Sequence, residues 1–160
     1  AERVLLSKAK WQSEVEYVDG TGGFGGGVID YMMQRGHSPQ EIHFSGKASD
    51  PRYYNKRAEM WFRMAEWIKR GGAIPYDEDL LKELVAPEYY FKNSKIILQS
   101  KEEIKDSLGF SPDRADALAL TFADVDMPTM SGEFGILYRN ESQASQKAAS
   151  DYDPLDPKRF

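Results

Sequence analysis

The sequence predicts an α/β fold in which a mixed sheet is flanked by helices. A short apolar strand that ends at Asp19 leads through a glycine-rich turn and a helix into a second strand, which together make a βαβ unit. Further along, two β-prone runs flank Asn93-Ser94 as a hairpin, and an apolar stripe of helical period fills residues 58–68. Because βαβ crossovers are right-handed, the first two strands are expected to be parallel, and the hairpin adds antiparallel pairing.

The composition fits one soluble domain with a packed core. The chain has 160 residues, of which 41% are hydrophobic and 29% charged, and its net charge is −5. It contains no Cys, which excludes disulfide frameworks, thiolate metal sites and cysteine nucleophiles. No apolar run approaches the roughly 20 residues that span a bilayer, so we expect an intracellular, soluble chain. Any polyanionic partner must meet a local basic patch, because the net charge is negative.

The N-terminal half contains the βαβ unit. Apolar residues at helical spacing predict a surface helix over 3–12, and residues 15–18 predict a strand that stops at Asp19-Gly20. Residues 20–27 are rich in glycine, which indicates positive φ angles or close approach of the backbone. The remaining elements of the unit are a helix over 28–33, stopped by Gly36, and a strand over 42–44.

The rest of the chain is predicted to be mainly helical. Asn55 is a favourable N-cap for a long helix that ends at Gly71-Gly72, and Ser111 is predicted to cap a last helix with Pro112 at its first position. The other predicted elements are a helix over 77–86 and strands over 89–92 and 95–99. Residues 126–160 lack sustained periodicity, so we predict a domain over 1–125 and a C-terminal tail or docking segment over 126–160.

Three carboxylates are candidates for chemistry. Asp19 ends a strand at the edge where open α/β sheets place their sites, and Asp113 and Asp116 share one face of the last helix. Converging carboxylates repel one another unless divalent cations neutralise them, and oxygen ligands favour Mg²⁺ or Mn²⁺ over zinc. A pair of such ions would activate water for phosphodiester cleavage.

Each of these features also has another interpretation. Asp19 is suited to accept hydrogen bonds from the glycine-rich turn, and Asp113 to stabilise a helix N-terminus. Residues 20–25 match G-x-G-x-x-G, which allows a nucleotide-binding α/β protein as an alternative. Against that alternative, Asp19 would face the pyrophosphate, and Ser45-Gly46-Lys47 stands where the ribose-binding acid should lie.

Four segments follow one another in a specific order along the chain. They are Asp19-Gly-Thr-Gly-Gly, then Asn55 to Trp61, then Tyr89 to Glu103, and finally Leu108 to Leu118. Their order and spacing resemble the C-terminal nuclease domain of tailed-bacteriophage terminase large subunits, over about residues 1 to 125. The resemblance implies a ribonuclease H-like fold and a metal-dependent endonuclease that cuts concatemeric double-stranded DNA by a two-metal mechanism.

The same resemblance implies ligands and partners. Asp19 and Asp116 would bind Mg²⁺ or Mn²⁺, with Asp113 as the nearby alternative. The expected partners are double-stranded DNA, the terminase small subunit, the portal and the ATPase motor domain of the same protein, in the host cell cytoplasm. Basic residues beside the acids are predicted to hold DNA phosphates without reading the base sequence; they are Arg52, Lys56, Arg57, Lys101 and Lys105.

The chain departs from this family at its beginning. The family's first metal-binding Asp lies on a strand upstream of the helix that corresponds to residues 3–12, so we expect the first strands of the fold to be missing here. Full two-metal activity is therefore not expected from these 160 residues alone. The alternative is a non-catalytic docking module that keeps the family fold and acts through its basic face and residues 126–160.

Overall fold

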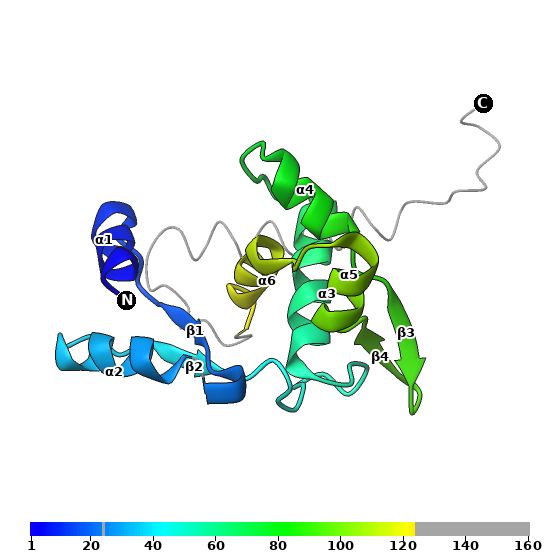
Figure 1. Ribbon diagram of the computed structural model, residues 1–160, viewed down its shortest axis with the longest axis horizontal. Coiled ribbons are helices and arrows are strands. Elements are labelled where there is room, and N and C mark those ends of the chain that lie inside the picture. The colour runs from blue at the N-terminus through cyan, green and yellow to red at the C-terminus, as the bar shows by residue number, and fades with distance from the viewer. Residues whose placement is uncertain (24, 124–160) are drawn as a thin grey trace, which may run out of the picture. The chain divides into compact units, whose positions relative to one another are not determined.

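The computed structural model describes residues 1–23 and 25–123, which belong to a unit that spans Ala1–Ala123 (Figure 1). The tail predicted over 126–160 lies outside the described residues. The elements, in chain order, are α1 (Glu2–Trp11), β1 (Tyr17–Asp19), η1 (Thr21–Gly23), α2 (Gly26–Gln34), β2 (Gln40–Ile42), α3 (Lys56–Lys69), α4 (Glu78–Val85), β3 (Tyr89–Lys92), β4 (Lys95–Leu98), α5 (Lys101–Leu108) and α6 (Asp113–Leu120). Within these described elements, no helix is both long and apolar enough to cross a membrane.

The βαβ unit forms as predicted, with β1 and β2 paired in parallel and Asp19 opposite Ile42. The second strand lies two residues earlier than the predicted 42–44. Its ladder ends at Ile42 because the amide of Phe44 donates to Thr21 Oγ1 at 2.9 Å instead of continuing the pairing. The glycine-rich turn is required sterically, since a Cβ at Gly25 would lie 2.3 Å from the carbonyl oxygen of Asp19.

The predicted hairpin pairs β3 with β4 in an antiparallel register, with Tyr89 opposite Leu98. It forms a sheet of its own, so the described residues contain a parallel and an antiparallel two-stranded sheet in place of the single mixed sheet that was predicted. The two turn residues have positive φ angles, 50° at Asn93 and 61° at Ser94. Two left-handed residues in sequence are the signature of a type I′ turn, whose twist matches that of the flanking strands.

The core is built around α3. Its N-cap is Asn55, whose Oδ1 accepts a hydrogen bond from the amide of Ala58 at 3.0 Å, as predicted. The buried side of α3 includes Met60 and Met64, and the helix contacts α6 and β4. In turn, α6 buries Ala115 and Ala119, whose small side chains allow two helices to approach closely.

Helix α5 was not predicted from the sequence. It begins with a capping box, in which the amide of Ser100 donates to Glu103 Oε2 at 2.8 Å and the amide of Glu103 donates to Ser100 Oγ at 3.2 Å. The S-x-x-E pattern was therefore a local signal for this helix. Because of α5, Lys101 lies in the first turn of a helix and not in an irregular connection.

The predicted cap of α6 is wrong. The N-cap is Pro112 rather than Ser111, and the Ser111 hydroxyl donates to Asp113 Oδ1 at 2.9 Å instead of accepting from the helix. The amides of Arg114 and Ala115, which a cap would satisfy, donate instead to Glu83 of α4. A tertiary contact thus takes the place of the local cap.

Candidate functional site

Helix α6 places Asp116 inside the protein. Its amide donates to the carbonyl of Pro112 at 2.8 Å in the first turn, and Asp116 as a whole is 2% exposed. Its neighbours Ala115 and Ala119 pack into the core, so the helix is held against α3 on the side that carries the carboxylate. A carboxylate at such a depth requires charged or hydrogen-bonding partners.

Two partners of Asp116 come from α3 and bind the same oxygen. Arg57 Nε donates to Oδ1 at 3.0 Å, and Trp61 Nε1 donates to Oδ1 at 2.6 Å. Residues four apart on a helix lie on one face, which explains how both reach one atom. The Arg57 guanidinium also donates from Nη1 to the carbonyl of Gln99 at 2.7 Å, which ties β4 to the network.

The other oxygen of Asp116 is in a different situation. Lys101 Nζ lies 2.9 Å from Oδ2, an ion-pair distance. The contact is an ion pair without a hydrogen bond. Oδ2 is therefore a buried oxygen that accepts no hydrogen bond from the residues that the structure describes. Arg57 Nη2 is a buried nitrogen in the same condition. Among the described residues these two atoms therefore keep unused hydrogen-bonding capacity, and the charge at Oδ2 is already balanced in part by the Lys101 ammonium.

Asp113 lies at the surface, one turn before Asp116. Its side chain is 75% exposed, and its Oδ1 is 3.8 Å from Lys101 Nζ. The Lys101 side chain is 34% exposed, so its ammonium group bridges an exposed and a buried carboxylate of the same helix. As predicted from their spacing, the two carboxylates share one side of α6.

Glu83 holds the start of α6, which sequence reasoning missed. Its Oε2 accepts from the amides of Arg114 at 2.7 Å and Ala115 at 2.9 Å, and the residue is 8% exposed. Arg114 also pairs with Asp77 at 2.9 Å and with Asp79 at 3.3 Å, both at the start of α4. No local signal marks Glu83, because a glutamate inside an amphipathic helix usually faces solvent.

Asp19 lies half-buried at the end of β1, where the sequence placed it. Its Oδ1 accepts a hydrogen bond from the amide of Thr21 at 2.9 Å. This is the bond to the glycine-rich turn that the sequence indicated as the alternative to metal binding. Strand β1 contacts α6, so the elements that carry Asp19 and Asp116 are neighbours. Asp19 has thus both a local role in the turn and a position near the helix that carries the other acids.

The residues fit a divalent cation only in part. Asp116 Oδ2 is a buried carboxylate oxygen without a hydrogen bond, which suits a hard cation. However, the described residues contain no group of three or more His, Cys, Asp or Glu side chains placed to hold a metal ion. The assignment of Asp19, Asp113 and Asp116 as joint ligands therefore stays a prediction.

The predicted DNA-binding residues differ in accessibility. Arg57 is 7% exposed and occupied by Asp116, and the Lys56 side chain is 14% exposed and paired with Glu59 at 3.1 Å. The Arg52 side chain is 72% exposed, and Lys105 is exposed on α5. Of the five, Arg52, Lys101 and Lys105 are thus the ones whose charge is open to solvent.

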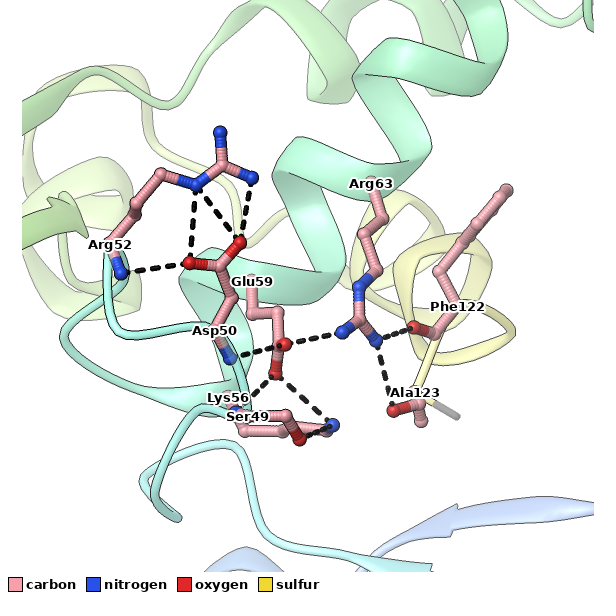
Figure 2. Close-up of polar contacts among 8 residues, drawn as sticks. All are labelled: Ser49, Asp50, Arg52, Lys56, Glu59, Arg63, Phe122 and Ala123. Atoms are coloured by element: carbon pink, nitrogen blue, oxygen red, sulfur yellow. Dashed lines mark hydrogen bonds and ion pairs between the residues drawn. The ribbon is translucent and has the colours of Figure 1, made fainter. Parts of the chain in front are cut away.

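A second buried carboxylate, Glu59, organises the chain before α3 (Figure 2). Its two oxygens accept from the amides of Asp50 and Ser49, each at 3.0 Å, and it pairs with Lys56 and Arg63. Burial alone would raise the pKa of Glu59, but the amide of Ser49 and the ammonium of Lys56 outweigh it and lower the pKa. Glu59 is thus a charged, fully bonded anchor.

No family model matches the chain, and no curated protein matches it either. Solved structures show its fold, which is ribonuclease H-like α/β, as the family resemblance implied. The chain is similar to the nuclease domain of the large terminase subunit gp2 of bacterial virus Sf6, at 20% identity and a TM-score of 0.59, covering 73% of this chain and 68% of that one. A lysine-to-alanine variant of that domain, solved with manganese, matches at 21% identity and a TM-score of 0.59, covering 73% and 69% of the two chains.

A further structure of the Sf6 variant contains calcium and matches at 20% identity and a TM-score of 0.59, covering 73% of this chain and 68% of that one. At these identities the likeness establishes the fold, so the predicted resemblance to terminase nuclease domains is confirmed at the level of the fold. The manganese and the calcium belong to the Sf6 structures.

Proposed function

We propose that this chain is the nuclease domain of a viral DNA-packaging terminase, a metal-dependent endonuclease that hydrolyses phosphodiester bonds of concatemeric double-stranded DNA. Its fold is that of a terminase nuclease domain, which supports the proposal. The observation that carries it is the buried carboxylate of Asp116, with one oxygen fixed by α3 and the other beside Lys101. A carboxylate kept in one orientation at such a depth is a costly arrangement, typical of functional sites.

In this proposal Asp116 holds Mg²⁺ or Mn²⁺ through Oδ2, together with Asp19 and with Asp113 at its exposed edge. The manganese and calcium in the Sf6 domain support a divalent cation of this kind. A bound metal ion would neutralise the carboxylates and lower the pKa of a bound water molecule. The family resemblance implies two such ions.

The other residues of the network position the carboxylate and the substrate. Arg57 and Trp61 fix Asp116 Oδ1, so that Oδ2 keeps one direction. Lys101 contributes a positive charge that is one-third exposed and can bind a DNA phosphate next to the carboxylates. Lys105, on the same helix as Lys101, extends the positive surface and positions the duplex. Arg52 is exposed but lies with Arg63 and Phe62 on another side of α3, so any DNA phosphate that it holds lies away from the carboxylates.

The proposal includes partners and a location. Double-stranded DNA is the substrate, and the terminase small subunit, the portal and the ATPase motor domain of the same protein are the partners that a packaging nuclease requires. The site of action is the host cell cytoplasm, where concatemeric viral DNA accumulates.

Replacing Asp116 with Asn tests this assignment. Asn is nearly isosteric and still accepts hydrogen bonds, but it removes the charge that would bind a metal. Cleavage of plasmid DNA in Mg²⁺ and in Mn²⁺ should fall by at least about 100-fold. Loss of a residue that only supports a metal ligand already costs about 10–100-fold, and the metal ligand itself should cost more. The assay is made with this chain and with a chain extended upstream, because the resemblance places another metal-binding Asp there.

Asp106→Asn is the matched control. Asp106 lies exposed on α5, so the same change of charge should leave cleavage unaltered. If Asp116→Asn cuts as fast as Asp106→Asn in the extended chain, Asp116 does not act in the reaction.

A non-catalytic docking module is the second candidate. One observation favours it: Asp116 already pairs with Arg57 and Lys101, so its charge is compensated by the protein itself. In that case neither the chain nor its extended form would cleave DNA in either metal, and Asp116→Asn would lower only the stability.

A further inference from the structure

A cavity of about 360 Å³ lies beside α3, on the side away from Asp116. Two α3 residues that line it, Arg63 and Glu66, and the C-cap Arg70 are spaced by three and four positions and therefore share one face of the helix. At 100° per residue, that face is roughly opposite to the one from which Arg57 and Trp61 reach Asp116. The cavity is therefore separate from the carboxylate site.

Two of the three arginines that line the cavity are held in place (Figure 2). Arg52 donates two hydrogen bonds to Asp50 Oδ2, from Nη2 at 2.6 Å and from Nε at 2.9 Å. Arg63 pairs with Glu59 and donates to the carbonyl of Phe122 at 3.3 Å. Such guanidinium groups keep further N–H donors for a ligand, because each carries five.

Arg70 supplies the charge that is not compensated. It lies exposed at the end of α3, and its guanidinium forms no ion pair with any residue of the described range. The other charged lining residues already have partners: Arg52 pairs with Asp50, Arg63 with the buried Glu59, and Glu66 with Lys69. Among the described residues this leaves the single positive charge of Arg70. One phosphodiester, with a single negative charge, would neutralise the cavity.

The rest of the lining is aromatic. Trp67 and Phe122 lie with their ring centroids 5.6 Å apart, and Tyr53 and Phe62 form a second pair at 5.4 Å. The backbone of Gly72 lies against the Trp67 ring, so the half-buried rings of Trp67 and Phe122 offer only their remaining surface to the cavity. Proteins stack unpaired bases on aromatic rings next to arginines, and each stacked base adds affinity without sequence preference. A volume near the lower end for small-ligand sites suits one nucleotide rather than a longer segment.

We propose that this cavity binds one nucleotide of an unpaired DNA strand, with the base against Trp67 and Phe122 and the phosphodiester at Arg70. The site requires neither Asp116 nor a metal ion, so it goes beyond the proposed nuclease. It would hold a frayed or cut strand end on the face of α3 opposite to the carboxylates.

The test measures binding in EDTA, where cleavage cannot contribute. The probes are a fluorescently labelled oligodeoxythymidylate and thymidine 5′-monophosphate, followed by anisotropy, by competition and by the NMR signal of the Trp67 indole N–H. The oligonucleotide should shift the Trp67 signal, and Arg70→Gln should weaken its binding about tenfold, the effect of one charge-assisted contact. Arg35→Gln is the matched control, since Arg35 is likewise an exposed arginine at the C-cap of a helix, α2, and lies outside the cavity lining, and it should change binding by less than about twofold.

Three results would overturn the proposal. An unchanged Trp67 signal in the unaltered protein would show that the strand does not enter the cavity. Equal losses in Arg70→Gln and Arg35→Gln would show diffuse attraction to the surface. If the mononucleotide binds as tightly as the oligonucleotide, the ligand of the cavity is a free nucleotide and not a DNA strand. None of these results depends on whether Asp116→Asn alters cleavage, so this site and the nuclease can fail separately.

Discussion

Removal of the Glu83 carboxylate should loosen the start of α6 and with it the helix that presents Asp116. Glu83→Ala leaves the amides of Arg114 and Ala115 without their acceptor, which lies 2.7 and 2.9 Å from them. Glu83→Gln keeps an oxygen at this position but removes its charge. The two variants therefore separate the hydrogen bonds from the electrostatic contribution.

The expected loss follows from the geometry of the contact. A hydrogen bond to a charged group contributes about 1.5–3 kcal/mol, and loss of a helix N-cap costs about 1–2 kcal/mol. Both figures describe the same two bonds of Glu83, so they are not added. We expect Glu83→Ala to lower the free energy of unfolding by about 2–3 kcal/mol, and Glu83→Gln by about 1 kcal/mol.

Urea unfolding and amide hydrogen exchange measure the effect. Exchange should accelerate at the amides of Arg114 and Ala115 more than elsewhere, because their local protection depends on Glu83. Glu78→Ala is the control, since Glu78 lies exposed in the first turn of the same helix. If Glu83→Ala costs no more than Glu78→Ala, or if those two amides exchange at an unchanged rate, the tertiary cap does not hold α6.

Two further predictions concern pH and the hairpin. The pKa of Glu59 is lowered from its usual value of 4.5, so its stabilisation is complete above that pH and is lost as the pH falls through the folded-state pKa. Glu59→Gln should therefore flatten the acid decline of stability, measured by urea unfolding at stepped pH, and equal declines in both proteins would contradict this. Ser94 adopts a left-handed conformation with φ 61°, so Ser94→Gly should raise the free energy of unfolding by about 1 kcal/mol. A lower melting temperature in that variant would rule out a strained type I′ turn.

Local features of the fold were readable from the sequence because their causes are local. The cap of α3 needs only Asn55 and the amide three residues later, and the hairpin needs only two residues that tolerate positive φ. The capping box of α5 was equally local, and the S-x-x-E pattern at Ser100 would have revealed it. The parallel pairing of β1 and β2 followed from the handedness of crossovers.

The candidate site was readable only in outline. Spacing placed Asp113 and Asp116 on one side of α6, and the end of a strand placed Asp19 at the sheet edge. Spacing did not show that Asp113 is exposed and Asp116 buried, because both occupy the first turn of the same helix. That difference arises from what packs against each residue.

Contacts between distant segments account for the rest. Asp116 is bound by side chains 59 and 55 positions earlier in the chain, and Glu83 reaches amides 31 and 32 positions later. Nothing in the sequence around Glu83 indicates that it accepts hydrogen bonds from the start of α6. Ser111, the nearest residue of a capping type, was therefore predicted as the N-cap, and this was wrong. Propensity and spacing act over a few residues, whereas the environment of a buried charge depends on which helices fold against it, and that is fixed by packing of the whole core.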